Sequence, residues 1–255
     1  MIQVEQLSCG YLDKEVLHGV SFDLPAQAFT ILLGPNGAGK STLLYALMGF
    51  LKPKQGRILI KGKDLGKCSR AELAKTIAYI PQELHSEFDY SVSDTVLMGR
   101  YPFMGLMQSH NDQDRHIVNE TLKQMDLYPL RNRLLHQLSG GEKQRVYLAR
   151  ALVQQTPYIF LDESISQLDI NYQLEIMRLL REISSNQNKG ILLISHNLNL
   201  SANYADSMLF LKEGSLLCAG SPEELMQESI LSSLYGINLA TALNPLSGKN
   251  NIIYP

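Results

Sequence analysis

The chain has 255 residues, of which 45% are hydrophobic and 19% charged, and its formal net charge is -2. This composition is typical of a globular protein with a large core, and the near-neutral balance gives no electrostatic reason to expect nucleic acid, which usually requires a basic face. Its three cysteines, Cys9, Cys68 and Cys218, lack the paired spacing of a metal site and indicate apolar or free thiols in a reducing compartment.

The first part of the chain, residues 2–60, is predicted to form short strands and turns, punctuated by glycine and proline. Within it, residues 29–33 (Phe-Thr-Ile-Leu-Leu) are a compact run of strand-forming residues. Residues 41–50 have leucines and a methionine near helical spacing, so a helix is expected there. A glycine-rich loop therefore connects a predicted strand to a predicted helix.

This loop matches the phosphate-binding P-loop pattern at every fixed position. Glycines let the backbone approach phosphates, and the N–H groups of the loop and of the following helix point at negative charge. Lys40 is expected to reach the β- and γ-phosphates, and the Ser41 hydroxyl to ligate Mg²⁺. By residue frequencies alone, a chance match is on the order of 1% for a chain of this length. The expected nucleotide-binding residues are Gly34, Pro35, Asn36, Gly37, Ala38, Gly39, Lys40, Ser41 and Thr42.

The middle of the chain, from about residue 84 to 155, has a helical pattern and few strand candidates. Strand-like runs return at 158–161, 190–195 and 208–211, and helical segments such as 171–185 separate them. This alternation predicts an α/β fold with a mostly parallel sheet. We therefore expect one domain over residues 1–255: a P-loop NTPase core, an N-terminal antiparallel β subdomain and an inserted helical subdomain. A tail rich in Asn, Gly and Ser, residues 244–255, is expected to be mobile.

Two acidic residues follow the apolar run that starts at Tyr158. Asp162 is expected to hold Mg²⁺, directly or through water, at the mouth of the nucleotide site. Glu163 is then placed to polarise the attacking water as a general base. Taken alone, this pair would indicate an exposed turn after a core strand; together with the P-loop it favours an ATPase site.

Residues 138–145 (Leu-Ser-Gly-Gly-Glu-Lys-Gln-Arg) resemble the signature sequence of the ATP-binding subunits of ABC transporters. Ser139 can cap a helix whose first turn contains Gly140 and Gly141, which would expose backbone donors to a phosphate. The resemblance implies that this signature faces the γ-phosphate bound by the P-loop of a second subunit. Two copies would then enclose two ATP molecules in a two-fold dimer.

Other positions match the same family one by one. Tyr11 resembles the aromatic residue that stacks on adenine, although a packed strand aromatic is an equal alternative. Gln82 resembles the glutamine that senses the γ-phosphate and Mg²⁺ and begins the helical subdomain. Asp169 matches the loop that crosses to the partner subunit, and His196 resembles the switch histidine that contacts the γ-phosphate. The resemblance thus assigns catalytic roles to Gln82, Glu163 and His196.

The chain departs from the family beside the expected base. Ser164 and Ile165 stand where the family usually has Pro and Thr, and Gln167 replaces a common small residue. These positions are expected at the dimer seam, so they could slow hydrolysis, but no primary phosphate ligand is missing.

Residues 91–102 (Ser-Val-Ser-Asp-Thr-Val-Leu-Met-Gly-Arg-Tyr-Pro) resemble a segment of importers of iron–siderophore, haem and vitamin B12 type. This resemblance implies an ATP-hydrolysing import motor that works with a second ATP-binding subunit of the same sequence, two transmembrane permease subunits and, indirectly, a substrate-binding protein. Transport specificity would then lie in the other polypeptides. With no signal peptide and no run of ~20 apolar residues, the chain is expected on the cytoplasmic face of the membrane, attached through the permeases.

Three alternatives are less favoured. A soluble ABC ATPase acting on nucleic acid or ribosomes usually has a long coiled-coil insert or two cassettes, and the sequence shows neither. An exporter motor is disfavoured by residues 98–105. A non-catalytic regulatory nucleotide binder is suggested only by Ser164.

Overall fold

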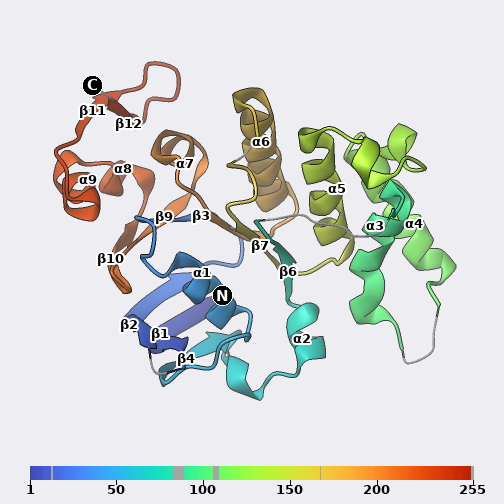
Figure 1. Ribbon diagram of the computed structural model, residues 1–255, viewed down its shortest axis with the longest axis horizontal. Coiled ribbons are helices and arrows are strands. Elements are labelled where there is room, and N and C mark those ends of the chain that lie inside the picture. The colour runs from blue at the N-terminus through green and yellow to red at the C-terminus, as the bar shows by residue number, and fades with distance from the viewer. Residues whose placement is uncertain (13, 83–88, 106–108, 167, 254–255) are drawn as a thin grey trace.

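The computed structural model describes residues 1–12, 14–82, 89–105, 109–166 and 168–253 (Figure 1). The strands are β1 (Ile2–Tyr11), β2 (Lys14–Leu24), β3 (Phe29–Leu33), β4 (Gln55–Ile60), β5 (Lys63–Asp64), β6 (Ile77–Ile80), β7 (Tyr158–Asp162), β8 (Gly190–Ile194), β9 (Ser207–Lys212), β10 (Ser215–Gly220), β11 (Ala240–Leu243) and β12 (Asn250–Ile253). The α-helices are α1 (Lys40–Leu47), α2 (Arg70–Ala74), α3 (Val92–Leu97), α4 (Asp112–Gln124), α5 (Gly140–Val153), α6 (Ile170–Asn186), α7 (Leu198–Tyr204), α8 (Pro222–Leu225) and α9 (Glu228–Tyr235). Short 3-10 helices are η1 (Leu65–Lys67), η2 (Met98–Phe103), η3 (Tyr128–Leu130) and η4 (Leu135–Gln137).

The central sheet has the strand order β10-β9-β3-β8-β7-β6, and all neighbours pair in parallel except β10 and β9. The prediction of a mostly parallel sheet is confirmed. Successive side chains of a strand point to opposite faces, so Ile31 and Leu33 pack into one hydrophobic core and Leu32 into another. Helices α5, α6 and α7 lie on the first face and α1 on the second (Figure 1).

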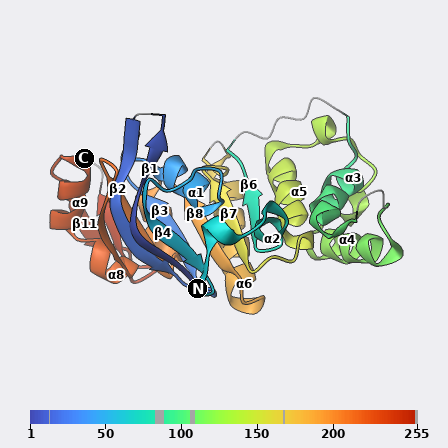
Figure 2. The same ribbon diagram turned by 90° about the horizontal axis from the view of Figure 1, so that it is seen from below.

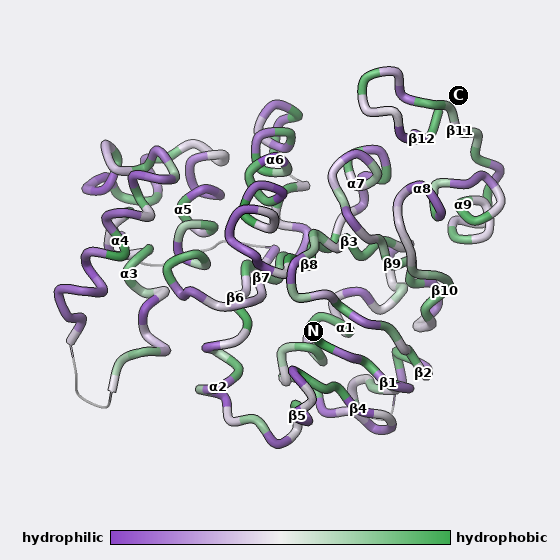
Figure 3. Tube along the Cα trace, turned by 180° about the vertical axis from the view of Figure 1, so that it is seen from behind, coloured by the Kyte–Doolittle hydropathy of each residue, from purple (hydrophilic) through white to green (hydrophobic). Residues whose placement is uncertain are grey.

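The N-terminal antiparallel subdomain is also confirmed. Its strands have the order β2-β1-β4-β5, and β1 pairs antiparallel with both β2 and β4. Its inner side chains share the second core with α1, which therefore lies between the two sheets. Figure 3 shows the hydrophobic colour concentrated on the central strands β3, β7 and β8, while α4 at the periphery is mostly hydrophilic.

Between residues 92 and 153, the described segments form helices that lie together at one end of the molecule (Figures 1 and 2). Side-chain caps begin the longest of them: Asn111 with Asp114 at α4, and Ser139 with Glu142 at α5, are complete capping boxes. The expected start of this subdomain at about residue 84 lies outside the described residues, and its division from the core stays a prediction.

The mobility expected for residues 244–255 stays a prediction, but part of this segment forms a strand. Strand β12 pairs antiparallel with β11, and Ile252 is only 4% exposed within the main core. The Asn-, Gly- and Ser-rich stretch that suggested mobility is the turn of this hairpin, while the burial of Ile252 orders the strand beyond it. Ser221 and Glu224 form a complete capping box at the start of α8.

In the part of the chain that the structure describes, no helix is both long enough and apolar enough to cross a bilayer.

Candidate active site

The P-loop lies between β3 and α1, as the sequence predicts. Gly39, the residue before α1, has a φ of 100°, and a Cβ there would lie 2.8 Å from Leu17 Cδ2. A side chain is thus excluded both by the backbone conformation and by β2, which packs against the loop. A cavity of about 360 Å³ opens beside the loop and is lined by Val16, Asn36, Gly37, Gly39, Lys40, Ser41, Thr42 and Glu163.

The Lys40 side chain folds back onto the P-loop. Its Nζ donates to the carbonyl oxygens of Gly34 and Pro35 at 2.9 and 3.0 Å, and the residue is only 6% exposed. Burial lowers the pKa of Lys40, and the nearby carboxylates of Glu163 and Asp162 oppose that shift. A buried ammonium with one donor still unassigned is suited to an anionic phosphate, which would also compensate its burial.

Asp162 is the last residue of β7 and lies beside Ser41, the second residue of α1. Ser41 Oγ and Asp162 Oδ1 are 3.5 Å apart, which is the long limit of a hydrogen bond. Because this contact is weak, both oxygens remain available as ligands of a metal ion. Burial first, and the charge of Glu163 second, raise the pKa of Asp162. A divalent cation would offset both effects.

The donor set fits Mg²⁺ in particular. Among the described residues, no cluster of three or more His, Cys, Asp or Glu side chains could hold a metal. Mg²⁺ is usually bound by one or two protein oxygens together with substrate phosphates and water, and Ser41 and Asp162 supply such a pair.

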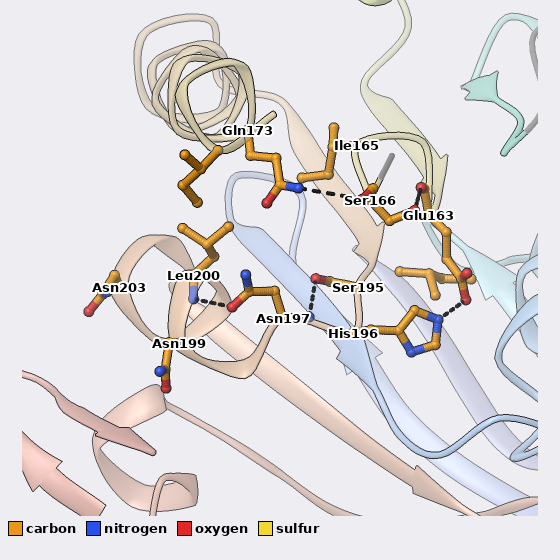
Figure 4. A pocket seen from close by; sticks show the side chains of 12 residues that line it. Glu163, Ile165, Ser166, Gln173, Ser195, His196, Asn197, Asn199, Leu200 and Asn203 are labelled. Carbon is orange, nitrogen blue, oxygen red and sulfur yellow. Dashed lines mark hydrogen bonds and ion pairs between the residues drawn. The ribbon is translucent and has the colours of Figure 1, made fainter. Parts of the chain in front are cut away.

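The three residues expected to be catalytic are brought together by the fold. Glu163 Oε1 lies 2.5 Å from His196 Nε2, and Glu163 Oε2 accepts a hydrogen bond from Gln82 Nε2 at 3.3 Å. Figure 4 shows His196 pointing at the Glu163 carboxylate. Gln82 comes from the segment after β6, Glu163 from the end of β7 and His196 from the end of β8. The carboxyl ends of three adjacent parallel strands therefore assemble this cluster.

Glu163 also has an unusual backbone. Its φ is 44°, in the left-handed region that costs a non-glycine residue roughly 1–2 kcal/mol. The turn is held by Ser166, whose backbone N–H and hydroxyl both donate to the Glu163 carbonyl oxygen, at 3.1 and 2.8 Å. Strain kept in place by such bonds is common where a side chain must be aimed at a reaction centre.

A second cavity, of about 520 Å³, is also lined by Glu163 and His196 of this cluster (Figure 4). It is lined by Glu163, Ile165, Ser166, Ile170, Gln173, Ile194, Ser195, His196, Asn197, Asn199, Leu200 and Asn203. Glu163 therefore lines both the P-loop cavity and this one.

The signature helix is built as predicted but stands apart from the P-loop. The Ser139 hydroxyl accepts a hydrogen bond from the Glu142 N–H, and the Glu142 carboxylate accepts one from the Ser139 N–H. Neither Ser139 nor its two glycines line the P-loop cavity of the same chain. Instead, a Cβ on Gly140 would lie 3.5 Å from Leu168, so the signature adjoins the loop before α6.

Gly141 is needed because α5 passes very close to α6. A Cβ at Gly141 would lie 2.3 Å from the Tyr172 ring, whereas one at Gly140 would make an ordinary contact. We expect Gly141→Ala to lower the free energy of unfolding by about 1–3 kcal/mol through overpacking. Gly140→Ala is the matched control, and urea unfolding of both purified variants is the measurement. Equal stability of the two variants would contradict this packing constraint.

The remaining sequence-predicted residues lie around this site. Tyr11 is 46% exposed and pairs with Lys14 in the β1–β2 hairpin. Lys14 is two residues before Val16, which lines the P-loop cavity. Asp169 is the N-cap residue of α6, although its side chain forms no capping hydrogen bond with the described helix. Their assigned contacts with adenine and with a partner subunit stay predictions.

The departures beside Glu163 have a structural account. Ile165 is 5% exposed and packs into the main core, and the Ser164 hydroxyl is buried without a hydrogen-bond partner among the described residues. An unpaired buried hydroxyl costs about 1–3 kcal/mol. Gln167 lies outside the described residues. The effect of these substitutions on turnover stays a prediction.

Sequence reasoning missed contacts that join distant segments. Arg145 of the signature helix pairs with Glu175 of α6 at 3.2 Å, and Arg100 pairs with Asp114 inside the helical end of the molecule. The spacing of these four residues along the chain matches no motif. The only sequence signal for the two pairs would have been charged residues that recur on the inward faces of predicted helices.

A P-loop between a buried strand and a helix, an acid-tipped strand in the same parallel sheet and a glycine-rich helix N-terminus define a P-loop nucleoside triphosphatase. A family model for the ABC transporter matches residues 17–166. The chain belongs to the ABC transporter family, and it is an ATP-binding cassette ATPase.

Several relatives match over nearly their whole length. The hemin import ATP-binding protein HmuV of Escherichia coli O157:H7 is 38% identical over 262 residues, covering 99% of both chains. The achromobactin transport ATP-binding protein CbrD of Dickeya dadantii is 33% identical over 244 residues, covering 96% of this chain and 91% of its own. Among solved structures, a metal-chelate type ABC transporter in an inward-facing conformation has a TM-score of 0.86 at 28% identity, covering 99% of this chain and 97% of its own.

Proposed function

We propose that this chain is the ATP-hydrolysing motor subunit of an importer for an iron chelate, such as a siderophore or haem, or for a vitamin B12-like molecule. The observation that carries the proposal is the similarity to proteins named for hemin and achromobactin transport, which extends over 91–99% of both partners' lengths. The cluster of Gln82, Glu163 and His196 supports an active ATPase rather than a regulatory nucleotide binder.

In this proposal, the P-loop backbone and Lys40 bind the ATP phosphates, and Tyr11 stacks on adenine. Ser41, Asp162 and Gln82 hold Mg²⁺, which would neutralise charge on the phosphate oxygens. Glu163 takes the proton of the attacking water, and His196 and Gln82 orient the water and the γ-phosphate.

The functional unit is proposed to be a dimer closed by ATP. Ser139, Gly140 and Gly141 lie outside the P-loop cavity of their own chain, which is the arrangement expected if they bind the nucleotide of a second copy. Asp169, beside this signature, would cross the same seam. Loss of the γ-phosphate removes the charge that joins the two copies, so hydrolysis opens the dimer.

Two permease subunits are proposed to dock beside α2 and η2. A cavity of about 300 Å³ there is lined by Met48, Gly49, Phe50, Arg70, Leu73, Ala74, Ile77, Tyr79, Arg150 and Gln154. Phe50 is 65% exposed, and Phe103 of the adjacent η2 is 39% exposed. Exposed aromatic side chains around a groove are typical of a protein interface. Docking there would place this chain on the cytoplasmic face of the membrane, with a substrate-binding protein on the other side.

The transport role is tested by deleting the gene in its own organism and measuring growth on single iron sources. We expect growth to fail on one chelate, among haem, hydroxamate and catecholate complexes, or on vitamin B12 as the only cobalamin. Wild-type chain should restore it, and Glu163→Gln should not. Normal growth on every source, together with copurification with ribosomes or nucleic acid rather than a membrane protein, would contradict the import role.

A further inference from the structure

We infer that Asn199 is a positioning residue for ATP hydrolysis, because it ties the helix that follows His196 to the C-terminal strand β12. This inference rests on the proposed role of His196 at the γ-phosphate. The two residues are three positions apart, but they point in different directions: His196 toward Glu163 and Asn199 away from it (Figure 4).

The side chain of Asn199 acts as a substitute strand partner for β12. Its Oδ1 accepts a hydrogen bond from the Ile252 N–H at 2.7 Å, and its Nδ2 donates to the Ile252 carbonyl oxygen at 3.1 Å. The backbone carbonyl oxygen of Asn199 also accepts a bond from Asn251 Nδ2 at 3.5 Å. A side-chain amide thus satisfies both backbone groups of one strand residue, which is the pairing that a neighbouring strand would give.

The strand that Asn199 grips is itself anchored. Ile252 is buried in the main core, and Asn250 Nδ2 donates to the Met226 carbonyl oxygen at 3.5 Å, just beyond α8. An isolated two-stranded hairpin is marginally stable, so these contacts order β12 and make it a fixed point against which α7 is held.

Helix α7 needs such a support. It has seven residues, and helices this short are marginal without tertiary contacts. Its N-cap, Asn197, directly follows His196: the Asn197 side chain accepts a bond from the Leu200 N–H at 3.0 Å, and its own N–H donates to Ser195 Oγ at 3.1 Å. His196 is therefore held between the end of β8 and the first turn of α7, and a displacement of that turn displaces the imidazole.

Replacing Asn199 by alanine should loosen this support without touching the P-loop. Small misplacements of a catalytic group can cost up to 10²-fold in rate, so we expect a roughly tenfold lower kcat with less than about a twofold change in KM for ATP. Asn203→Ala is the matched control. It makes the same change one turn later on α7, and its Oδ1 has no hydrogen-bond partner among the described residues.

A double-mutant cycle separates positioning from a general loss of stability. Asn199→Ala should lower kcat in the wild-type chain but have little further effect when His196 is already alanine, since coupled residues are non-additive. Thermal unfolding of each variant is measured beside the ATPase rate. A tenfold loss that is as large in the His196→Ala background, or that Asn203→Ala reproduces, overturns the inference.

The same variants separate a failure of the proposed role of His196 from a failure of the inference on Asn199. If His196→Ala retains wild-type turnover, the proposed role of His196 fails, and the inference built on it fails as well. If His196→Ala is impaired while Asn199→Ala is not, only the inference on Asn199 is overturned.

Discussion

Replacing Glu163 by glutamine is expected to lower ATP turnover by roughly 10²–10⁴-fold, the range for a lost general base, while ATP binding is retained. Glutamine keeps the size of the side chain and an oxygen to accept a bond from Gln82, but it cannot take a proton from water. Lys40, proposed to bind the phosphates, and Ser41, proposed to bind Mg²⁺, are unchanged. Turnover of the purified chain and its elution by size exclusion with and without ATP are the measurements.

The amide variant should also accumulate as an ATP-bound dimer, because the dimer opens only after hydrolysis in the proposed cycle. Glu182→Gln is the matched control: it makes the same change at an exposed position on α6. Wild-type turnover in Glu163→Gln would show that another group acts as the base. Lost turnover without an ATP-dependent dimer would argue against the dimer closed by ATP, but not against Glu163 as the general base.

Removing Asp114 is expected to give the largest loss of stability among the single changes considered. The Arg100–Asp114 pair is buried, with side chains 8% and 7% exposed, and Arg100 Nε lies 2.8 Å from Asp114 Oδ1. Arg100 Nη1 also donates to the carbonyl oxygen of Val153, at 2.8 Å, and to Gln155 Oε1, at 3.1 Å. The pair therefore joins η2, α4 and the end of α5.

The carboxylate is adapted to this environment. Burial alone would raise the pKa of Asp114, but hydrogen bonds from Arg100 and from the Asn111 N–H outweigh it and lower the pKa. Asp114→Ala would leave the guanidinium buried without its counter-charge, and breaking a buried pair in this way costs about 3–5 kcal/mol. Denaturant unfolding of the purified variant measures this loss.

A matched pair on the same helix provides the control. Glu120 and Lys123 also form a salt bridge on α4, at 2.7 Å, but their side chains are 54% and 56% exposed. Glu120→Ala should leave the denaturant midpoint close to that of the wild type, because an exposed ion pair contributes little to stability. Similar losses in the two variants would mean that burial does not govern the Arg100–Asp114 pair.

Features that the sequence predicts well are those carried by a continuous stretch of chain. The P-loop, the acid-tipped strand β7 and the capped signature helix each depend on neighbouring residues, so motif and spacing identify them. The alternation of strand-like and helix-like runs also predicts the parallel sheet, because crossover helices are required between parallel strands.

The strand at residues 250–253 was not predicted, for the opposite reason. The turn between β11 and β12 has the composition of a flexible segment, and no local signal shows that Ile252 enters the main core or that Asn199 satisfies its backbone groups. That contact joins residues 53 positions apart.

The sequence by itself thus determined the family and the P-loop, and it predicted which residue types would carry out hydrolysis. Only the tertiary structure decided which of them meet. Gln82 and Glu163 are 81 positions apart and come together because β6 and β7 are neighbours in the sheet. The bond between Asn199 and Ile252, and the buried Arg100–Asp114 pair, likewise depend on packing between segments. Such contacts arise from the summed burial of the whole chain, and no local pattern encodes them.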